Sequence, residues 1–193
     1  MIVLIDKIGN RFVKDGIITE EDKELYTFGM QQGIIIILNI ISTIIMGIIF
    51  DMVWQSVVFL LAYMPLRSYA GGYHSRTQIR CYLVSLFIIA VALIGMKEIQ
   101  WTSIIALFSV IISAGIIFTL TPVEDANKPL DASEKDLYKR KTRKILLLEI
   151  LIALVFWFIN KEISVCIIMV FDILSIMLLL GILNNRKLMD QKD

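Results

Sequence analysis

The 193-residue sequence contains little charge, little proline and few of the residues that commonly bind metals. Charged residues make up 19% of the chain, below the share of about 25% in typical soluble domains. The two cysteines, Cys81 and Cys166, lie far apart and form neither a CxxC motif nor a disulfide framework. Because a single histidine accompanies them, the sequence argues against a zinc site, and we expect neither a metal ion nor a cofactor.

Hydrophobic residues dominate the composition instead, at 58% of the chain with a mean hydropathy of +0.78. This apolar fraction exceeds that of soluble domains and indicates an integral membrane protein, for which we expect no nucleic-acid partner. The opening MIVLIDKIGNRFVKDG is interrupted by charges and lacks a small-residue cleavage site. We therefore expect no cleavable signal peptide.

The apolar residues are grouped into six runs separated by polar segments. These runs are residues 33–50, 52–66, 81–96, 101–121, 145–159 and 163–183. A membrane-spanning helix needs about 20 residues and at least roughly 17, so the second, third and fifth runs, of 15 or 16 residues, span only with help from flanking residues. We predict an all-α polytopic membrane protein with about six transmembrane helices.

Basic residues are distributed unevenly among the segments that connect these runs. Counted along the chain, 17 of the 19 Lys and Arg residues lie in alternate segments, and only Lys97 and Lys161 lie in the others. In membrane proteins, the cytoplasmic loops carry the excess of Lys and Arg. We therefore expect a multi-pass protein of the cell membrane with both termini in the cytoplasm. A wrong number of spans would scramble this segregation.

The first 32 residues have amphipathic patterns rather than a continuous apolar run. Ile5, Ile8 and Phe12 recur at helical spacing, and TEED at residues 19–22 has the form of a helix start for a second short helix. Such helices either lie against the inner leaflet or pack on the membrane bundle, and the sequence leaves both open. We predict one membrane domain made of interfacial helices, a six-helix region and a cytoplasmic tail, over residues 1–32, 33–183 and 184–193.

The segment RSYAGGYHSRTQIRC, residues 67–81, interrupts the apolar runs and holds the only histidine, His74, together with Cys81. A cysteine attacks as a thiolate, which a nearby histidine and a helix N-terminus both favour. On one continuous helix, seven residues would separate the two side chains by about 10 Å. This is too far for a hydrogen bond, so a catalytic dyad requires the backbone to turn.

Two glycines and two hydroxyl residues can provide this turn. Gly71 and Gly72 permit positive φ and close approach of the backbone, and Ser75 or Thr77 can cap a helix that runs through the cysteine into the third apolar run. Arg67 either holds the glycine turn or binds a substrate carboxylate. A dyad is one interpretation of the segment, and a histidine and a cysteine with no shared role is the other.

Cys166, Glu149 and Asp172 lie inside the apolar runs and each allow more than one interpretation. Cys166 has apolar neighbours and no basic one, so we interpret it as a small buried residue. Glu149 and Asp172 either line a path for a peptide or an ion, or make hydrogen bonds to Asn39, Ser85 or another helix. We favour the structural interpretation.

The residues of the 67–81 segment have the spacing of a known family. With Arg67, Gly72, His74 and Cys81 in these positions, the sequence resembles the accessory gene regulator B (AgrB) family, the membrane cysteine peptidases of Gram-positive peptide quorum sensing. Ser75 stands where the family more often has alanine. Size and number of spans agree along the chain, and the first 32 residues show no signature of the family.

The resemblance extends to the polar segment after the fourth apolar run. There, TPVEDANKPL contains a proline and then a Lys–Pro pair, as the family's loop does. The resemblance implies a cysteine endopeptidase in which His74 and Cys81 are catalytic. The residues that it implies to bind substrate or support the site are Arg67, Gly71, Gly72, Ser75, Lys128 and Pro129.

A small AgrD-like propeptide is the implied substrate, with an amphipathic N-terminal part, a central signal segment and an acidic C-terminal part. Cys81 would cleave after the signal segment, and a cysteine or serine side chain of the substrate would close a thiolactone or lactone ring. The basic inner face suits an acidic tail, although it equally fits orientation and lipid binding. Expected partners are the propeptide and membrane lipid, and the sequence leaves a monomer and a homodimer open.

A small six-helix transporter or channel is the alternative function, and a non-enzymatic membrane interaction protein is a third. Basic inner loops fit each of these classes. The apolar runs show no convincing pair of related halves and contain few charges, which argues against the transporter.

Both termini and the 67–81 segment should face the cytoplasm. In a background with Cys81→Ala and Cys166→Ala, single cysteines introduced by Ser75→Cys or Asp190→Cys should react with a membrane-impermeant maleimide only after the cells are permeabilised. Strong labelling of either cysteine in intact cells would refute the six-span arrangement.

Overall fold

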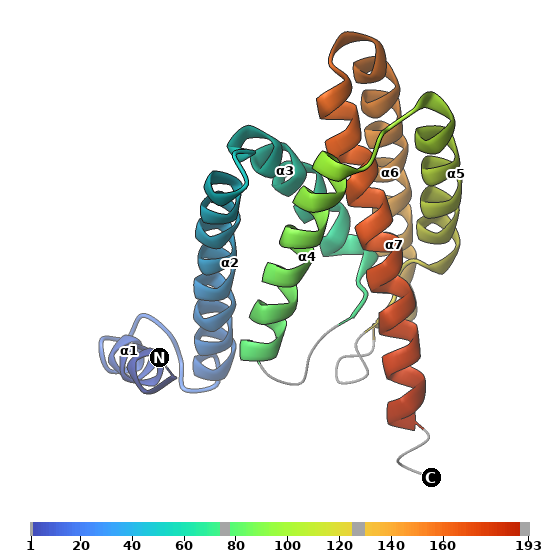
Figure 1. The fold of residues 1–193 in the computed structure, drawn as a ribbon. Helices are drawn as coiled ribbons and strands as arrows, with labels where there is room; N and C mark the ends of the chain where they lie inside the picture. The colour runs from blue at the N-terminus through green and yellow to red at the C-terminus, as the bar shows by residue number, and fades with distance from the viewer. Residues whose placement is uncertain (1, 74–77, 125–129, 190–193) are drawn as a thin grey trace. The chain divides into compact units, whose positions relative to one another are not determined.

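The computed structural model describes the backbone of residues 2–73, 78–124 and 130–189, with all side chains in these ranges except those of residues 2–4, 78 and 187–189. Over the described residues the chain forms seven helices and no strand (Figure 1). The helices are α1 (Ile2–Lys14), α2 (Lys23–Ile49), α3 (Val53–Ala70), α4 (Gln78–Glu98), α5 (Ser103–Leu120), α6 (Ala132–Ile159) and α7 (Lys161–Met189). The all-α prediction is confirmed.

The chain divides into two compact units, of which the smaller is Met1–Ser42. It contains α1 and the first part of α2. Ile5 of α1 is buried, as its place in the amphipathic pattern predicts. Gly9 lies against Thr27 of α2, because a methyl group on Gly9 would come within 2.7 Å of the threonine Cγ2.

The predicted second short helix is not a separate element. The TEED turn is present, since Asp22 N donates to Thr19 Oγ1 at 3.2 Å. The helix that follows begins at Lys23 and continues to Ile49 without a break, so the prediction of a separate second helix is wrong, whereas the division at residue 32 stays a prediction. No proline occurs between these residues, and nothing else interrupts the backbone hydrogen bonds of the helix.

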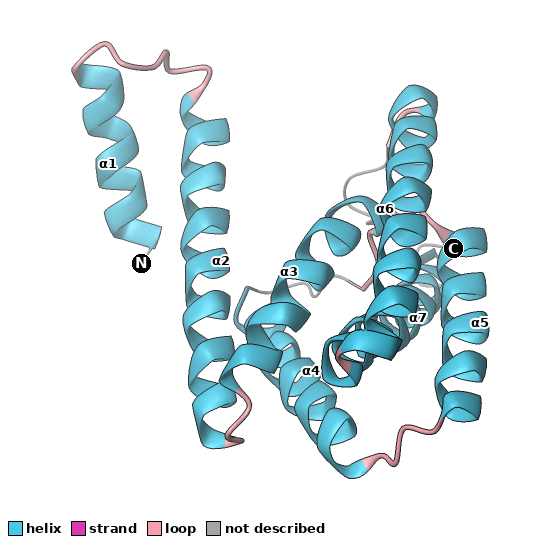
Figure 2. Cartoon of the chain, turned by 90° about the horizontal axis from the view of Figure 1, so that it is seen from above, coloured by secondary structure: helices cyan, strands magenta, loops and turns pink. Residues whose placement is uncertain are grey.

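The larger unit, Thr43–Asp193, is organised around α7. This helix packs against α3, α4, α5 and α6 (Figure 2). Its most apolar stretch is 72% buried, whereas the corresponding stretches of α4 and α5 are 22% and 17% buried. Phe171, Leu174 and Leu178 of α7 have no exposed surface. The α7 side chains therefore form the centre of the core.

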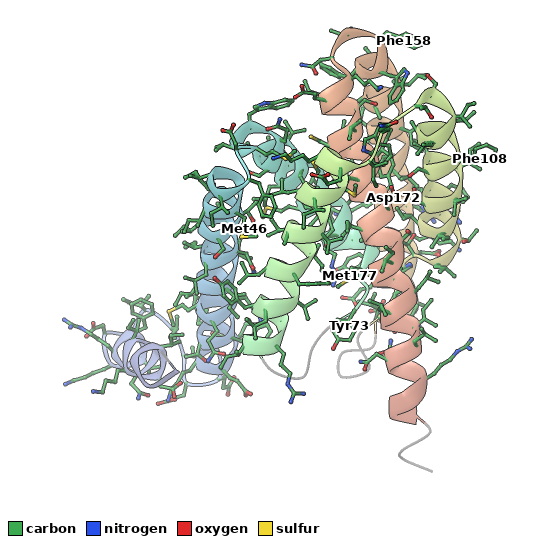
Figure 3. All side chains as sticks on the ribbon, viewed as in Figure 1. Met46, Tyr73, Phe108, Phe158, Asp172 and Met177 are labelled. Atoms are coloured by element: carbon green, nitrogen blue, oxygen red, sulfur yellow. The ribbon has the colours of Figure 1, made fainter. Side chains whose placement is uncertain are left out.

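The outer surface of the larger unit is apolar. Phe108 of α5 is 60% exposed and Phe158 of α6 is 82% exposed, and both point away from the bundle in Figure 3. Soluble proteins rarely expose large apolar surfaces. In a bilayer, by contrast, helices can present apolar side chains to lipid because their backbone groups are satisfied internally.

Four of the described helices are long and apolar enough to cross a membrane, namely α2, α4, α5 and α7. The prediction of a polytopic membrane protein is therefore confirmed. The α3 helix contains Pro65 and Arg67, and the first half of α6 is highly charged, so neither is apolar throughout. The count of six spans stays a prediction.

The connections of the larger unit gather at two ends. The turns before α3 and α5 and the first turn of α7 all contribute to one cavity. The linkers after α3 and α5 meet at the other end, where Gly72 N donates to Val123 O at 3.2 Å. The last turns of α7 are there too, because Asn185 Nδ2 donates to Glu124 O at 2.8 Å. For these segments, the structure agrees with the two groups that the basic residues indicate.

Gly181 of α7 lies against the backbone of the α3–α4 linker. A methyl group at this position would come within 2.7 Å of Gly72 C and 2.8 Å of Tyr73 N, and these backbone atoms cannot rotate away. Gly181→Ala should therefore destabilise the fold by about 1–3 kcal/mol, as overpacking typically does, and lower the melting temperature in detergent.

The matched control is Gly115→Ala in α5, because nothing in the described part of the chain lies within 4 Å of the position of its added methyl group. This variant should melt at the wild-type temperature or above it, since alanine favours a helix over glycine. Equal melting temperatures for the two variants would contradict the close packing at Gly181.

Candidate active site

The linker between α3 and α4 is fixed at its start by backbone hydrogen bonds. Val123 N donates to Ala70 O at 2.9 Å, and Gly72 N donates to Val123 O at 3.2 Å. One residue further, Tyr73 N donates to Met177 O of α7 at 2.9 Å, and Figure 3 shows these two residues next to one another. Both the α5–α6 linker and α7 therefore hold the segment that leads to His74.

Gly71 and Gly72 are glycines for two physical reasons. Their φ angles are +73° and +122°, in a region that other residues rarely adopt. A side chain would also collide with its neighbours, since a methyl group on Gly71 would overlap the Val123 carbonyl oxygen and one on Gly72 would lie 3.1 Å from Met177 O. The glycine turn that the sequence predicts is present.

Arg67 holds this turn. Its Nη2 donates to Tyr73 O at 2.7 Å, which ties the last turn of α3 to the linker. The other terminal nitrogen, Nη1, is buried and has no hydrogen-bond partner among the described residues. Of the two roles that the sequence left open for Arg67, the structure thus supports the one in which it holds the glycine turn.

Cys81 lies at the end of the first turn of α4, which begins at Gln78. Its side chain is partly exposed and its thiol is free. The thiol therefore lies at the end of α4 where the backbone N–H groups have no partner within the helix. His74 and Ser75 lie outside the described residues, and the dyad therefore stays a prediction.

The linker between α5 and α6 is closed by Glu124. Its carboxylate pairs with Lys135 Nζ at 2.7 Å and accepts a hydrogen bond from Leu130 N at 3.0 Å. The bond from Lys135 holds the pKa of Glu124 below its ordinary range, so the carboxylate stays charged at neutral pH. Lys128 and Pro129 lie outside the described residues, in a short stretch whose two ends this carboxylate joins.

Three of the four residues by which the sequence resembles the AgrB family, namely Arg67, Gly72 and Cys81, lie in the described part of α3, its linker and α4. The sequence model of the accessory gene regulator B family matches residues 5–179 of the chain. The chain belongs to this family.

Two AgrB-like proteins of Clostridium perfringens are similar to this AgrB chain. The protein of strain 13 is 27% identical over 131 residues, and that of strain SM101 is 29% identical over 133 residues. Each comparison covers 64% of this chain and 60% of the relative, so the chain spans about 60% of the length of the curated relatives that it matches. No solved structure matches it.

Some basic residues at the start of α6 serve the fold of this AgrB chain. Arg143 lies over the Phe118 ring, 4.0 Å from its centroid, and its Nη2 donates to Phe118 O at 3.2 Å. This bond satisfies a carbonyl in the last turn of α5. Lys141 lies 4.7 Å from the centroid of the Tyr69 ring. The cluster that the sequence predicts as a binding or orienting surface is therefore partly structural.

The two acidic residues in the membrane region have different surroundings. Ser109 Oγ of α5 lies 2.6 Å from both carboxylate oxygens of Asp172, near the middle of the bundle (Figure 3). The structural interpretation of Asp172 is confirmed, with a partner on another helix instead of Asn39 or Ser85. Glu149 is buried, and its Oε2 has no partner among the described residues.

The second cysteine lies at the opposite end of the larger unit. Cys166 is 1% exposed and contributes to a cavity of about 440 Å³ together with the α4–α5 turn. Met96 of α4 lines the same cavity and is separated from Cys81 by 15 residues, or about 22 Å of helix. The interpretation of Cys166 as a small buried residue is confirmed. Within the described ranges, no three His, Cys, Asp or Glu residues are placed to hold a metal ion.

Sequence reasoning missed the residues that anchor the site from other helices. Met177 and Val123 contribute backbone atoms only. Because every residue type has a backbone carbonyl, the sequence gives no signal for these two positions. Gly181 had a signal, since a glycine in an otherwise apolar helix often marks a close approach.

Proposed function

We propose that this AgrB chain is a membrane-embedded cysteine endopeptidase that cleaves an AgrD-like propeptide and allows its cyclisation for quorum sensing. The observation that carries the proposal is the position of Cys81, a partly exposed thiol in the first turn of α4. It follows a linker whose start is fixed by backbone bonds to two other elements. The role of His74 as general base comes from the sequence.

In the proposed reaction, His74 takes the proton of the Cys81 thiol, and the thiolate attacks the carbonyl carbon after the signal segment. When the tetrahedral intermediate collapses, the C–N bond breaks and the amine of the acidic part leaves with the proton from His74. The acyl group remains on Cys81 as a thioester. A cysteine or serine side chain of the substrate then attacks it, which closes the ring and releases the Cys81 thiol.

The basic residues at the start of α6 are proposed to bind the acidic part of the propeptide. Lys139, Arg140 and Lys141 lie within the cytoplasmic group of connections in the predicted orientation, at the same end of the larger unit as Cys81. Arg143 is excluded from this role because its guanidinium holds the end of α5.

Cys81→Ala should abolish propeptide cleavage, because no other thiol at this end of the protein can form the acyl-enzyme. Cys81→Ser should be nearly inactive, since a hydroxyl is far less acidic than a thiol. His74→Ala should slow acylation by about 10²- to 10⁴-fold, which is typical for the loss of a general base. Cleavage is measured in membranes that contain equal amounts of each variant.

Cys166→Ala is the matched control, because it removes the other thiol from a buried position at the far end of the unit. It should cleave nearly as fast as the wild type. Full activity of Cys81→Ala would overturn the peptidase assignment and make the transporter or channel the leading function.

Replacing Lys139, Arg140 and Lys141 together by glutamine should weaken propeptide binding, and more so at low salt than at high salt, because exposed charges are screened. The control replaces Lys97 and Lys161 by glutamine, which removes charge from the opposite end of the unit. Unchanged binding in correctly inserted triple variant would show that the cluster only orients the protein and holds lipid.

A further inference from the structure

A lysine in the first half of α6 is held in place by an aromatic side chain of α3. Lys141 Nζ donates to the Tyr69 hydroxyl at 3.4 Å and lies 4.7 Å from the centroid of the same ring. The Tyr69 ring is itself packed, since its centroid lies 5.7 Å from that of the Tyr138 ring in an edge-on contact. The ammonium group of Lys141 therefore has a defined position between α3 and α6.

The two arginines nearest to Lys141 along α6 are engaged with other groups. Arg140 Nη2 lies 3.8 Å from Asp136 Oδ2, and the Arg143 guanidinium holds the end of α5. No ion pair among the described residues involves Lys141. Its charge is thus fixed in position but not neutralised by a carboxylate. A lysine ammonium has three hydrogen-bond donors, of which the bond to Tyr69 uses one.

The Tyr69 hydroxyl provides a further donor beside this ammonium group. A phenol can accept a hydrogen bond from lysine and still donate its own proton, and the part of the chain that the structure describes shows no acceptor for that proton. Lys141 is exposed, so a ligand can reach its ammonium group. Since a carboxylate has two acceptor oxygens, the ammonium and the phenol can donate to it together.

The pair formed by Tyr69 and Lys141 lies at the end of the larger unit that holds the candidate site. Tyr69 is in the last turn of α3. It directly precedes Ala70, whose carbonyl oxygen accepts the hydrogen bond from Val123 N. The residue that holds the lysine is therefore continuous in the chain with the linker that leads to Cys81.

We propose that Tyr69 and Lys141 together bind one carboxylate of the acidic part of the propeptide, with the phenol and the ammonium group as the two donors. This inference rests on the proposed peptidase function. Hydrogen bonds between charged groups are stronger than neutral ones, and an ammonium group that is already held loses less side-chain freedom when a ligand binds. One acidic residue of the propeptide therefore contributes more to binding than its neighbours do.

The test is a double-mutant cycle between this pair and the propeptide, with binding measured in the Cys81→Ala background so that no cleavage occurs. The probes are the propeptide itself and versions in which each Asp or Glu of its acidic part is replaced singly by Asn or Gln. Tyr69→Phe keeps the ring and removes only the hydroxyl, and Lys141→Gln removes the charge. Each should weaken binding of the unmodified propeptide by about 10-fold or more, the effect of losing one hydrogen bond to a charged group.

One of the altered propeptides should reveal the partner of the pair. It should bind the reference protein about 10-fold or more weakly, and neither Tyr69→Phe nor Lys141→Gln should weaken it much further, because the contact is already lost. With Cys81 present, the loss should appear in KM and not in kcat, since the bound carboxylate is remote from the reacting bond.

Two further variants serve as controls. Lys144→Gln removes the same charge from an exposed position on the same helix, and it should change the affinity by less than about two-fold, because exposed charges that make no direct contact are screened. Lys141→Arg keeps a cation that can stack on the tyrosine ring and bind a carboxylate. It should retain most of the affinity, which would show that a defect of Lys141→Gln does not come from misfolding.

Three outcomes would overturn this role of the pair. Equal losses of affinity for Lys141→Gln and Lys144→Gln would show a general attraction between charges. Wild-type affinity of Tyr69→Phe, or an equal effect of this change on every version of the propeptide, would show that the phenol contacts no carboxylate. In each case an inactive Cys81→Ala in the cleavage assay leaves the peptidase assignment intact, whereas an active Cys81→Ala removes that assignment itself.

Discussion

The hydrogen bond from Tyr73 N to Met177 O is the contact on which the arrangement of the site depends. It joins the segment that leads to the histidine to the most buried helix of the larger unit. Arg67 adds a bond to the carbonyl of the same tyrosine, so both polar backbone groups of one residue are fixed. A linker that leads to a proposed base needs such support, because loops otherwise move more than the elements that they connect.

Polar groups within the helical bundle have structural tasks that lower their cost in lipid. Asp172 is bonded to Ser109, and Ser164 Oγ donates to Ala153 O at 2.8 Å. Side-chain bonds of this kind connect neighbouring helices in membrane proteins. Glu149 is buried as well, but its Oε2 lacks such a partner among the described residues.

Much of the fold could be predicted from local features of the sequence. The apolar runs indicated the membrane helices, Pro122 marked the end of α5, and the glycine pair marked the turn before Cys81. The start of α2 could not be predicted well, because the polar residues before position 33 suit a short amphipathic helix and the beginning of a long one equally. The two cases differ in whether the helix continues without a break. Residue types give little indication of this where no proline interrupts the helix.

Contacts between helices were harder to predict than the helices themselves. Ser109 and Asp172 are 63 residues apart, and nothing in the spacing of either run marks them as partners. The same holds for Tyr73 and Met177, whose backbone bond depends on how the α3–α4 linker packs against α7. A single sequence contains the periodicity that forms an element, but not the register in which two elements meet.

The anchor between the linker and α7 is built almost entirely from backbone atoms. The close approach in this anchor requires that Gly72 and Gly181 have no side chain. Residues 73 and 177 contribute only their main-chain N–H and C=O groups. Such an anchor tolerates wide divergence in the side chains around it. A chain can therefore differ from another at most of its positions and still hold a linker of this kind in the same place, as long as two glycines remain.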